Sequence, residues 1–218
     1  MDWSALTPSR WIDGVRYSLQ RKQLRDARYA FLFDDAPADE YVSLDCETTG
    51  LNTRTDHIIS VGAVRIKSNR ILASQRLELL IQPPSDVPAE SIRVHRLRHA
   101  DVAGGMPVEA AMEQLLHFIG SRPLVGYFLE FDVAMLNRVI KPMLGIKLPQ
   151  PQIEVSALYY DYQFKRLPPY QQHDNAGIDL KFDTMMQALD LPVREAHDAL
   201  NDAVMAALAF IKLRELES

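Results

Sequence analysis

Three features are scarce in this 218-residue chain: cysteine, long apolar runs and a surplus of positive charge. The one cysteine, Cys46, excludes a protein held together by internal disulfides. No apolar run approaches the ~18 to 20 residues of a membrane span, which excludes an integral membrane protein. The first residues lack the basic start and apolar core of a signal peptide. We therefore expect a cytoplasmic protein with no membrane partner.

The charge balance excludes a protein that coats nucleic acid, because 29 acidic residues against 24 Lys and Arg give a net charge of −5. Any nucleic-acid substrate must then be attracted locally, by bound metal ions or by a basic patch. The apolar fraction of 47% is enough for a folded core. The length fits one domain of ordinary size with a small appendage.

A short acidic motif ends an apolar strand pattern at residues 41–51. Asp45 and Glu47 are two positions apart, so on a strand both carboxylates point to the same face. Two neighbouring carboxylates repel each other unless a cation lies between them or one of them is protonated. Hard divalent cations such as Mg²⁺ prefer oxygen ligands of this kind. We therefore favour a metal site over the alternative, an exposed acidic pair at a strand end.

Two further acidic stretches lie far along the chain. Asp132 follows a short apolar strand at 124–126 and stands where an N-cap belongs. His197 precedes a helix, and Asp202 follows five positions later, so the two side chains lie on neighbouring sides of that helix. Taken singly, each has a structural explanation: Asp132 and His197 as caps, and Asp202 as a solvated acid.

The apolar pattern changes along the chain from strands to helices. Strands are predicted to start at 41 and to span 56–67 and 71–81, as in an antiparallel meander. Helices are predicted at 107–119, 132–144, 178–189 and 197–213, with the short strand at 124–126 between the first two. Residues 153–160 fit either a strand or a helix. Residues 88–105 are expected to be irregular, and 163–175 to form a mobile loop.

The first 40 residues differ in character from the rest. Residues 8–30 are predicted to form one helix that carries six basic residues against two acidic ones. Residues 34–40 are expected to be an acidic, proline-containing linker. The helix is either a solvated face or an arm for a nucleic acid or a protein partner, and the pattern leaves both open. We expect an N-terminal helical extension and linker at 1–40 and one larger domain at 41–218.

Together the acidic stretches resemble the motifs of the DEDDh family of 3′–5′ exonucleases, whose best-known member is the proofreading epsilon subunit of bacterial DNA polymerase III. Residues 45–50 match the first motif, Phe131 and Asp132 the second, and His197 with Asp202 the third. The resemblance covers about 41–213. It implies a ribonuclease-H-like α/β fold, in which a mixed sheet of a three-strand antiparallel meander plus parallel strands is flanked by helices.

The same resemblance implies two-metal phosphodiester hydrolysis with Mg²⁺ or Mn²⁺ as the two ions. Asp45, Glu47 and Asp202 would hold the ion that activates water. Asp45 would bridge to the second ion, and Asp132 would support that second ion through water. The charge of the four carboxylates roughly balances that of two divalent cations.

Three more roles follow from the resemblance, and one departure bears on them. His197 would accept the proton of the attacking water, which suits a neutral imidazole near pH 7. Thr48 would contact the terminal 3′-nucleotide, and Leu51 would wedge against its base. Many members carry a His-Asn pair before the second-motif acid, where this chain has Tyr127 and Phe128. That departure changes the residues at the position where many family members support the substrate phosphate.

The expected substrate is the 3′ end of single-stranded DNA or RNA, and nothing in the sequence identifies a reader of the 2′-hydroxyl. DNA proofreading or repair and the trimming of short RNA both remain open. A hypothesis of another class is a polymerase-associated or scaffold subunit that binds a protein partner. The intact acid set favours the enzyme. Among the other histidines, His173 is the one candidate for a substitute base.

Overall fold

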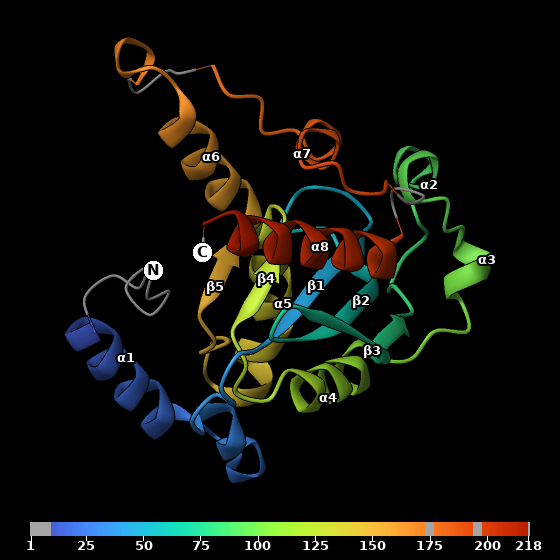
Figure 1. Ribbon diagram of the computed structural model, residues 1–218. Helices are drawn as coiled ribbons and strands as arrows, with labels where there is room; N and C mark the ends of the chain where they lie inside the picture. The colour runs from blue at the N-terminus through green and yellow to red at the C-terminus, as the bar shows by residue number, and fades with distance from the viewer. Residues whose placement is uncertain (1–9, 173–176, 194–197, 218) are drawn as a thin grey trace.

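A five-stranded mixed sheet forms the centre of the molecule, seen in a computed structural model that describes residues 10–172, 177–193 and 198–217 (Figure 1). The strand order is β3-β2-β1-β4-β5, with β1 in the middle. The first three strands pair antiparallel and the last two join in parallel, as the sequence predicted. The bounds are Glu40–Thr48 for β1, Ile58–Lys67 for β2, Arg70–Leu80 for β3, Leu124–Gly126 for β4 and Gln152–Glu154 for β5.

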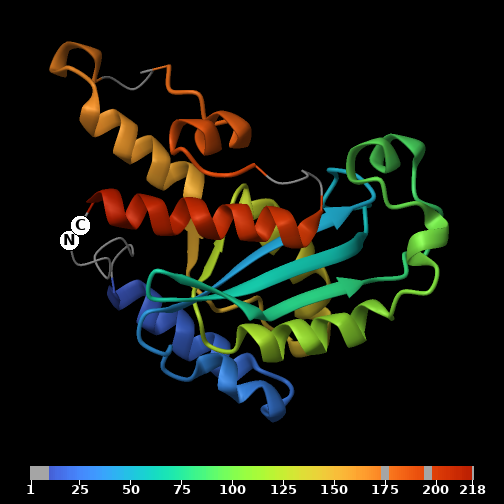
Figure 2. The same cartoon turned by 45° about the vertical axis from the view of Figure 1, so that its right-hand side comes forward.

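Helices cover both faces of this sheet (Figure 2). On one face α8, Ala199–Glu217, crosses β1 and β2. On the other face lie α4, Val108–Ile119, and α5, Leu129–Leu144. Alternate side chains of each strand point to opposite faces, so β1 contributes to both layers. Its apolar residues Val42, Leu44 and Cys46 are buried in the core on the α4/α5 side. Beneath α8, a second core contains Val64 and Phe210.

Five further helices complete the described part of the fold beyond residue 80, and they correct three predictions. The stretch 88–105, expected to be irregular, contains α2, Ala89–His95, and α3, His99–Val102. These helices are too short to show a periodic apolar pattern in the sequence. Residues 153–160 form the end of β5 and the start of α6, Val155–Arg166, which extends into the predicted loop. The 3₁₀ helix η3, Pro169–Gln171, lies in that loop as well, whose residues 173–175 lie outside the described ranges. The predicted helix at 178–189 is shorter, because α7 spans Phe182–Ala188.

The N-terminal segment consists of two helices in place of the single predicted one. The α-helix α1 spans Arg10–Gln23, and the 3₁₀ helix η2 spans Ala27–Phe33. The break occurs because the Asp26 side chain accepts a hydrogen bond from the Arg28 N–H and caps η2. Tyr29, Leu32 and Phe33 of η2 are buried in the same core as Leu44. This part of the extension therefore packs as an integral layer of the fold.

The acidic stretch that follows η2 is fastened to the body of the protein. Asp39 lies in the left-handed region, with φ 56°. Its carboxylate accepts a hydrogen bond from Arg214 Nη2 of α8 at 2.8 Å, and its carbonyl accepts from the Ser68 N–H. The division of the chain at residue 40 into an extension and a domain stays a prediction. None of the described helices is both long and apolar enough to cross a membrane.

Candidate active site

One face of β1 carries polar side chains toward α8. Ser43, Asp45 and Glu47 alternate with the apolar residues of the strand and therefore share this face. The Ser43 hydroxyl donates to the Ala203 carbonyl of α8 at 2.7 Å, which fixes the helix against the strand. Asp202 directly precedes Ala203. The first turns of α8 thus bring a third carboxylate to the two on β1.

A glycine in the neighbouring strand allows this close approach of α8. Gly62 of β2 pairs with Asp45 of β1. A Cβ atom at Gly62 would lie 2.2 Å from the backbone nitrogen of Leu200 and from the carbonyl carbon of Ala199. No side chain fits there, since real Cβ contacts are essentially never that short. The backbone of α8 rests directly on β2, and this contact sets the position of Asp202.

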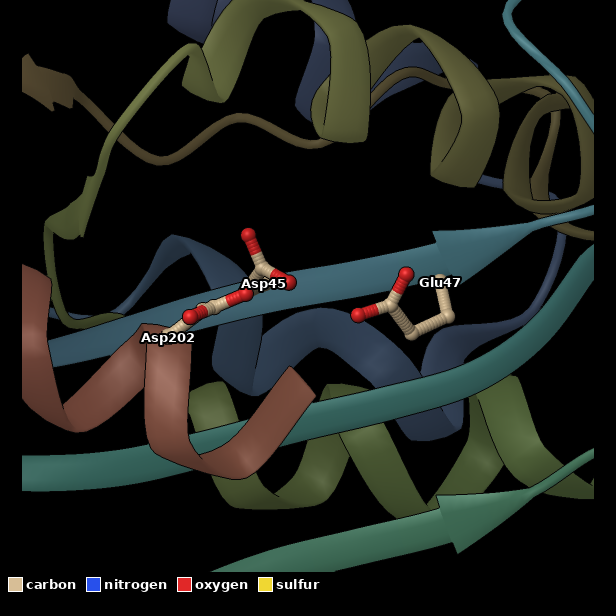
Figure 3. Close-up of side chains that lie close together, drawn as sticks. All are labelled: Asp45, Glu47 and Asp202. Carbon is tan, nitrogen blue, oxygen red and sulfur yellow. The ribbon is translucent and has the colours of Figure 1, made fainter. Parts of the chain in front are cut away.

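The three carboxylates meet in one cluster (Figure 3). Asp45, Glu47 and Asp202 each offer an oxygen, and these oxygens all lie within 4.8 Å of one another. In Figure 3 the Asp45 and Glu47 side chains come from β1 and the Asp202 side chain from α8, with their carboxylates turned toward one another. The sequence placed Asp45 and Glu47 side by side. The structure brings Asp202, 155 residues after Glu47, to these two acids, in the group that the resemblance implied.

Asp132 reaches the same strand from α5, and it is not the N-cap of that helix. The N-cap of α5 is Phe128, so Asp132 lies one turn inside the helix, with 4% of its surface exposed. Its Oδ1 accepts a hydrogen bond from the backbone N–H of Cys46 at 3.1 Å. Earlier in β1, the Val42 N–H on that edge donates to the Pro123 carbonyl at the start of β4. Because β4 ends at Gly126, Asp132 supplies the acceptor that a longer strand would have supplied.

The electrostatics of the cluster favour a bound cation. Burial is the largest cause that raises the pKa of Asp45 well above its usual value, and the charges of Asp132, Asp202 and Glu47 add to it. Burial together with Asp202 and Asp198 raises the pKa of Glu47 to about 7. Burial also raises the pKa of Asp132, although the Cys46 N–H lowers it. These groups repel one another as anions, and hard oxygen donors around one point are what Mg²⁺ or Mn²⁺ binds. The residues present therefore fit divalent metal ions.

Asp198 adds negative charge near the cluster, although it lies outside the predicted motif spacing. Its carboxylate accepts a hydrogen bond from the Asn201 N–H at 2.9 Å and caps the first turn of α8. It also raises the pKa values of Asp45 and Glu47. An Asp directly before a helical pattern is the sequence signal for this role. The predicted base His197 and its substitute His173 lie outside the described residues.

The turn after β1 holds Leu51 away from the core. The Thr48 hydroxyl donates to the Gly50 carbonyl at 2.7 Å, while the Asp56 carboxylate accepts from the Asn52 N–H at 2.7 Å. Arg138 of α5 donates to the Thr53 carbonyl in the same turn. Leu51 is 82% exposed. The predicted contacts of Thr48 and Leu51 with substrate stay predictions, and an exposed apolar side chain in the turn that follows β1 is compatible with the predicted wedge.

The Tyr127–Phe128 pair places its two rings in different surroundings. The Tyr127 hydroxyl donates to the Leu180 carbonyl at 3.0 Å, and its ring stacks on Phe182 of α7 with 4.5 Å between centroids. Phe128 is 65% exposed at the start of α5. One ring therefore anchors the segment around α7, and the other faces solvent.

Comparison with known proteins identifies the family. The sequence pattern of the exonuclease family RNase_T matches residues 42–210, and the chain belongs to this family. It is 26% identical over 175 residues to the epsilon subunit of DNA polymerase III from Aquifex aeolicus, an alignment that covers 80% of each chain. It is 26% identical over 193 residues to the PolC-type DNA polymerase III of Thermotoga petrophila. That alignment covers 88% of this chain but 13% of the relative's length.

Solved structures share the fold. The zinc-bound complex of Escherichia coli exonuclease I with single-stranded DNA has a TM-score of 0.67 at 13% identity, covering 84% of this chain and 41% of that chain. Exonuclease X in complex with 5′ overhanging duplex DNA has a TM-score of 0.61 at 22% identity, covering 80% of this chain and 91% of that chain. The ribonuclease-H-like α/β fold expected from the sequence is thus confirmed.

Proposed function

We propose that this protein is a metal-dependent 3′–5′ exonuclease that removes nucleotides from the ends of single-stranded nucleic acid. The observation that carries the proposal is the cluster of Asp45, Glu47 and Asp202, with Asp132 against the same strand, in a chain of the exonuclease family. Phosphodiester hydrolysis needs an activated water and stabilisation of the charge on the leaving oxygen. Two bound Mg²⁺ or Mn²⁺ ions would supply both.

Each acid has a proposed task that its position supports. Asp45, Glu47 and Asp202 would hold the first ion, and Asp45 would be shared with the second. Asp132 would hold water around the second ion while it keeps its hydrogen bond to the Cys46 N–H. His197 would take the proton that the attacking water loses. Thr48 and Leu51 would position the terminal nucleotide at the turn that follows β1.

The direct test incubates the full chain with 5′-labelled single-stranded DNA, duplex DNA and short RNA in Mg²⁺ or Mn²⁺. We expect labelled products that shorten stepwise from the 3′ end and no products in EDTA. His197→Ala is expected to slow the reaction by ~10² to 10⁴, the usual size of a general-base contribution. Labelled mononucleotide as the first product, or turnover that survives EDTA, would contradict the proposal. The three substrates together separate a DNA enzyme from a short-RNA exoribonuclease.

A second candidate, compatible with the first, is action as part of a DNA polymerase assembly. The observation that favours it is the likeness to the epsilon subunit and to PolC-type polymerases, whose names place them in DNA polymerase III. In that setting the chain would proofread 3′ ends or serve mainly as a bound subunit. Co-purification with a polymerase subunit, tested in parallel with the Asp202→Asn variant, would separate binding from hydrolysis. A protein that purifies alone and digests free 3′ ends efficiently would argue for an independent nuclease.

A further inference from the structure

The backbone of Phe128 is strained, and its ring is exposed. Its φ of 54° and ψ of 32° lie in the left-handed region, which disfavours side chains with a Cβ. The other described non-glycine residues with positive φ are polar: Asp39, Ser68, Arg96 and Asp190. Phe128 is 65% exposed, so its ring gains little from the core in return for this strain. Strain of this kind in an exposed ring points to a function outside the folded chain itself.

The surrounding contacts hold the strained residue in place. The Glu154 carboxylate accepts hydrogen bonds from the Phe128 N–H at 3.1 Å and from the Leu129 N–H at 2.9 Å. The same carboxylate accepts from the N–H and the hydroxyl of Ser156, so both its oxygens are engaged. On the preceding residue, the Tyr127 ring is fixed against Phe182. The orientation of the Phe128 ring is therefore built into the fold.

The Phe128 ring lies at the N-terminus of α5, four residues before Asp132. It stacks on Phe131 with 6.1 Å between centroids and 16° between planes, and Phe131 directly precedes Asp132. Asp132 in turn bonds to the strand that carries Asp45 and Glu47. The first turn of α5 thus presents a flat aromatic surface on its outer side and a metal-site acid on its inner side.

We propose that Phe128 is a base-stacking residue that holds one of the last nucleotides of the strand whose 3′ end is cleaved. The inference rests on the proposed function and adds a substrate contact to it. Glu130 and Asp132 follow Phe128 in the first turn of α5, and the Glu154 carboxylate accepts its N–H, so these three acidic groups repel phosphates wherever no cation intervenes. Stacking depends little on charge and suits every base, and it is worth a substantial share of affinity in single-strand binding. The Phe128 ring would attract a nucleotide through its base, whereas the acidic side chains named above repel its phosphate.

The test is a double-mutant cycle between this ring and the bases of the substrate. The full chain binds 5′-fluorescein oligodeoxythymidylates in EDTA, where no turnover is expected, and anisotropy gives the Kd. Each of the last five nucleotides is replaced in turn by an abasic unit. We expect one position at which the abasic unit weakens wild-type binding about tenfold. Phe128→Ala should show about the same loss with the intact strand and no further loss at that abasic position.

Two further variants separate stacking from other effects. Phe128→Trp should restore the wild-type Kd because it offers a larger ring. Tyr170→Ala removes another exposed ring, 79% exposed on η3, and should leave the Kd unchanged. In Mg²⁺, Phe128→Ala should raise KM about tenfold with kcat nearly unchanged. The dependence of the Kd on salt should stay as in the wild type, because no phosphate contact is lost.

Several results would overturn the proposal. If wild type shortens the oligonucleotide from its 3′ end but Phe128→Ala binds equally well, this proposal fails and the proposed function stands. An equal loss in Tyr170→Ala, or an abasic penalty that persists undiminished in Phe128→Ala, would exclude a specific contact between ring and base. If wild type neither binds nor shortens 3′ ends, the proposed function fails and this proposal fails with it. A Phe128→Ala variant that loses only a protein partner would assign the ring to protein docking instead.

Discussion

The two faces of β1, a strand of nine residues, have different roles. Toward α4 and α5, the strand buries Val42, Leu44 and Cys46 in a core that η2 closes from outside. Toward α8, it presents the buried Ser43 and Glu47 and the half-buried Asp45, and the two acids are held close to Asp202. One face lowers the free energy of the fold by removing apolar area from water. The other face raises it by holding like charges together, and a bound cation would offset this cost.

The largest effect is expected from substitutions that remove negative charge from the acidic face of β1. Asp45→Asn and Asp202→Asn should each lower turnover by about 10³ or more, because a metal site of this kind supplies several kcal/mol of transition-state stabilisation. The same substitutions should raise the melting temperature of the metal-free protein, since repulsion within the cluster is relieved. Nuclease assays and thermal denaturation in EDTA measure the two effects. A variant with near wild-type turnover would show that the cluster is not the catalytic centre.

The next largest effect is expected from a deletion that removes η2, which covers the core on the apolar face of β1. A chain that starts at Pro37 loses the buried side chains of Tyr29, Leu32 and Phe33, each worth ~1.5 to 3 kcal/mol. A typical domain has a total stability of about 5 to 15 kcal/mol, so we expect this shortened chain to be largely unfolded. As the matched control, a chain that starts at Leu24 keeps η2 and should stay folded. Circular dichroism and urea denaturation compare the two, and a stable, active chain from Pro37 would restore the boundary predicted at residue 40.

A single substitution on the apolar face should lower stability without changing the chemistry. Leu44→Ala leaves a cavity at a fully buried position and should reduce the free energy of unfolding by about 2 to 5 kcal/mol. Turnover per folded molecule should stay near the wild-type value, in contrast to Asp45→Asn one residue away. Urea denaturation and active-site titration measure the two quantities. Val42→Ala provides a smaller cavity on the same face, and a larger loss there would contradict the cavity argument.

The pH dependence of stability should differ between the faces as well. The folded pKa of Glu47 is raised from 4.5 to about 7, so the native state binds its proton more tightly than the unfolded chain does. Stability of the metal-free protein should therefore fall as pH rises from about 4.5 to about 7, by roughly 1 to 3 kcal/mol. Glu47→Gln should reduce this slope, and added Mg²⁺ should restore stability at pH 7.

The matched control for that slope is Asp101→Asn. Hydrogen bonds from Arg98 lower the pKa of Asp101 to about 2, so this group stays charged across the whole window. Its substitution should leave the slope between pH 4.5 and 7 unchanged. Melting temperatures measured in EDTA across this range test both variants. A slope that survives in Glu47→Gln would assign it to Asp45 and Asp132, whose pKa values are raised as well.

The smallest expected effect concerns Phe128. Phe128→Asn places a residue that tolerates the left-handed region at this site, which relieves about 1 to 2 kcal/mol of strain. It also removes a ring contact with Phe131 worth about 0.5 to 1.5 kcal/mol. We expect a net gain in the free energy of unfolding of up to about 1 kcal/mol, while Phe128→Ala, which keeps the strain, should lose stability. A marked loss in Phe128→Asn would show that the ring is a structural part of the fold.

The local parts of the site could be predicted from the sequence. The spacing of Asp45 and Glu47 places both on one face of any strand, and the meander followed from alternating apolar residues. Asp26 before η2 was a visible capping signal, but apolar residues at four-residue spacing earlier in the segment favoured a single helix. Helices α2 and α3 were missed because four to seven residues carry too little periodicity.

The long-range parts could not be predicted from local pattern. The position of Asp202 depends on where α8 crosses β2, and only the resemblance to a family indicated that it would join Asp45. Asp132 looked like an N-cap, since nothing in its own neighbourhood shows that β4 is too short to pair with Cys46. The outward ring of Phe128 depends on Glu154, which approaches from the next strand of the sheet. The positions of these side chains are set by contacts between segments that are far apart in the sequence.

Gly62 is a position whose importance a genetic screen would detect from phenotypes alone. It carries no charge, binds no substrate and contributes no side chain, yet α8 lies on its backbone where a Cβ would be 2.2 Å away. Every substitution there must push the start of α8 off the sheet and carry Asp202 with it. A saturation screen for lost activity would therefore score position 62 as severely as the acids themselves. The hydrogen atom in place of a side chain at Gly62 is as much a requirement of the reaction as any carboxylate.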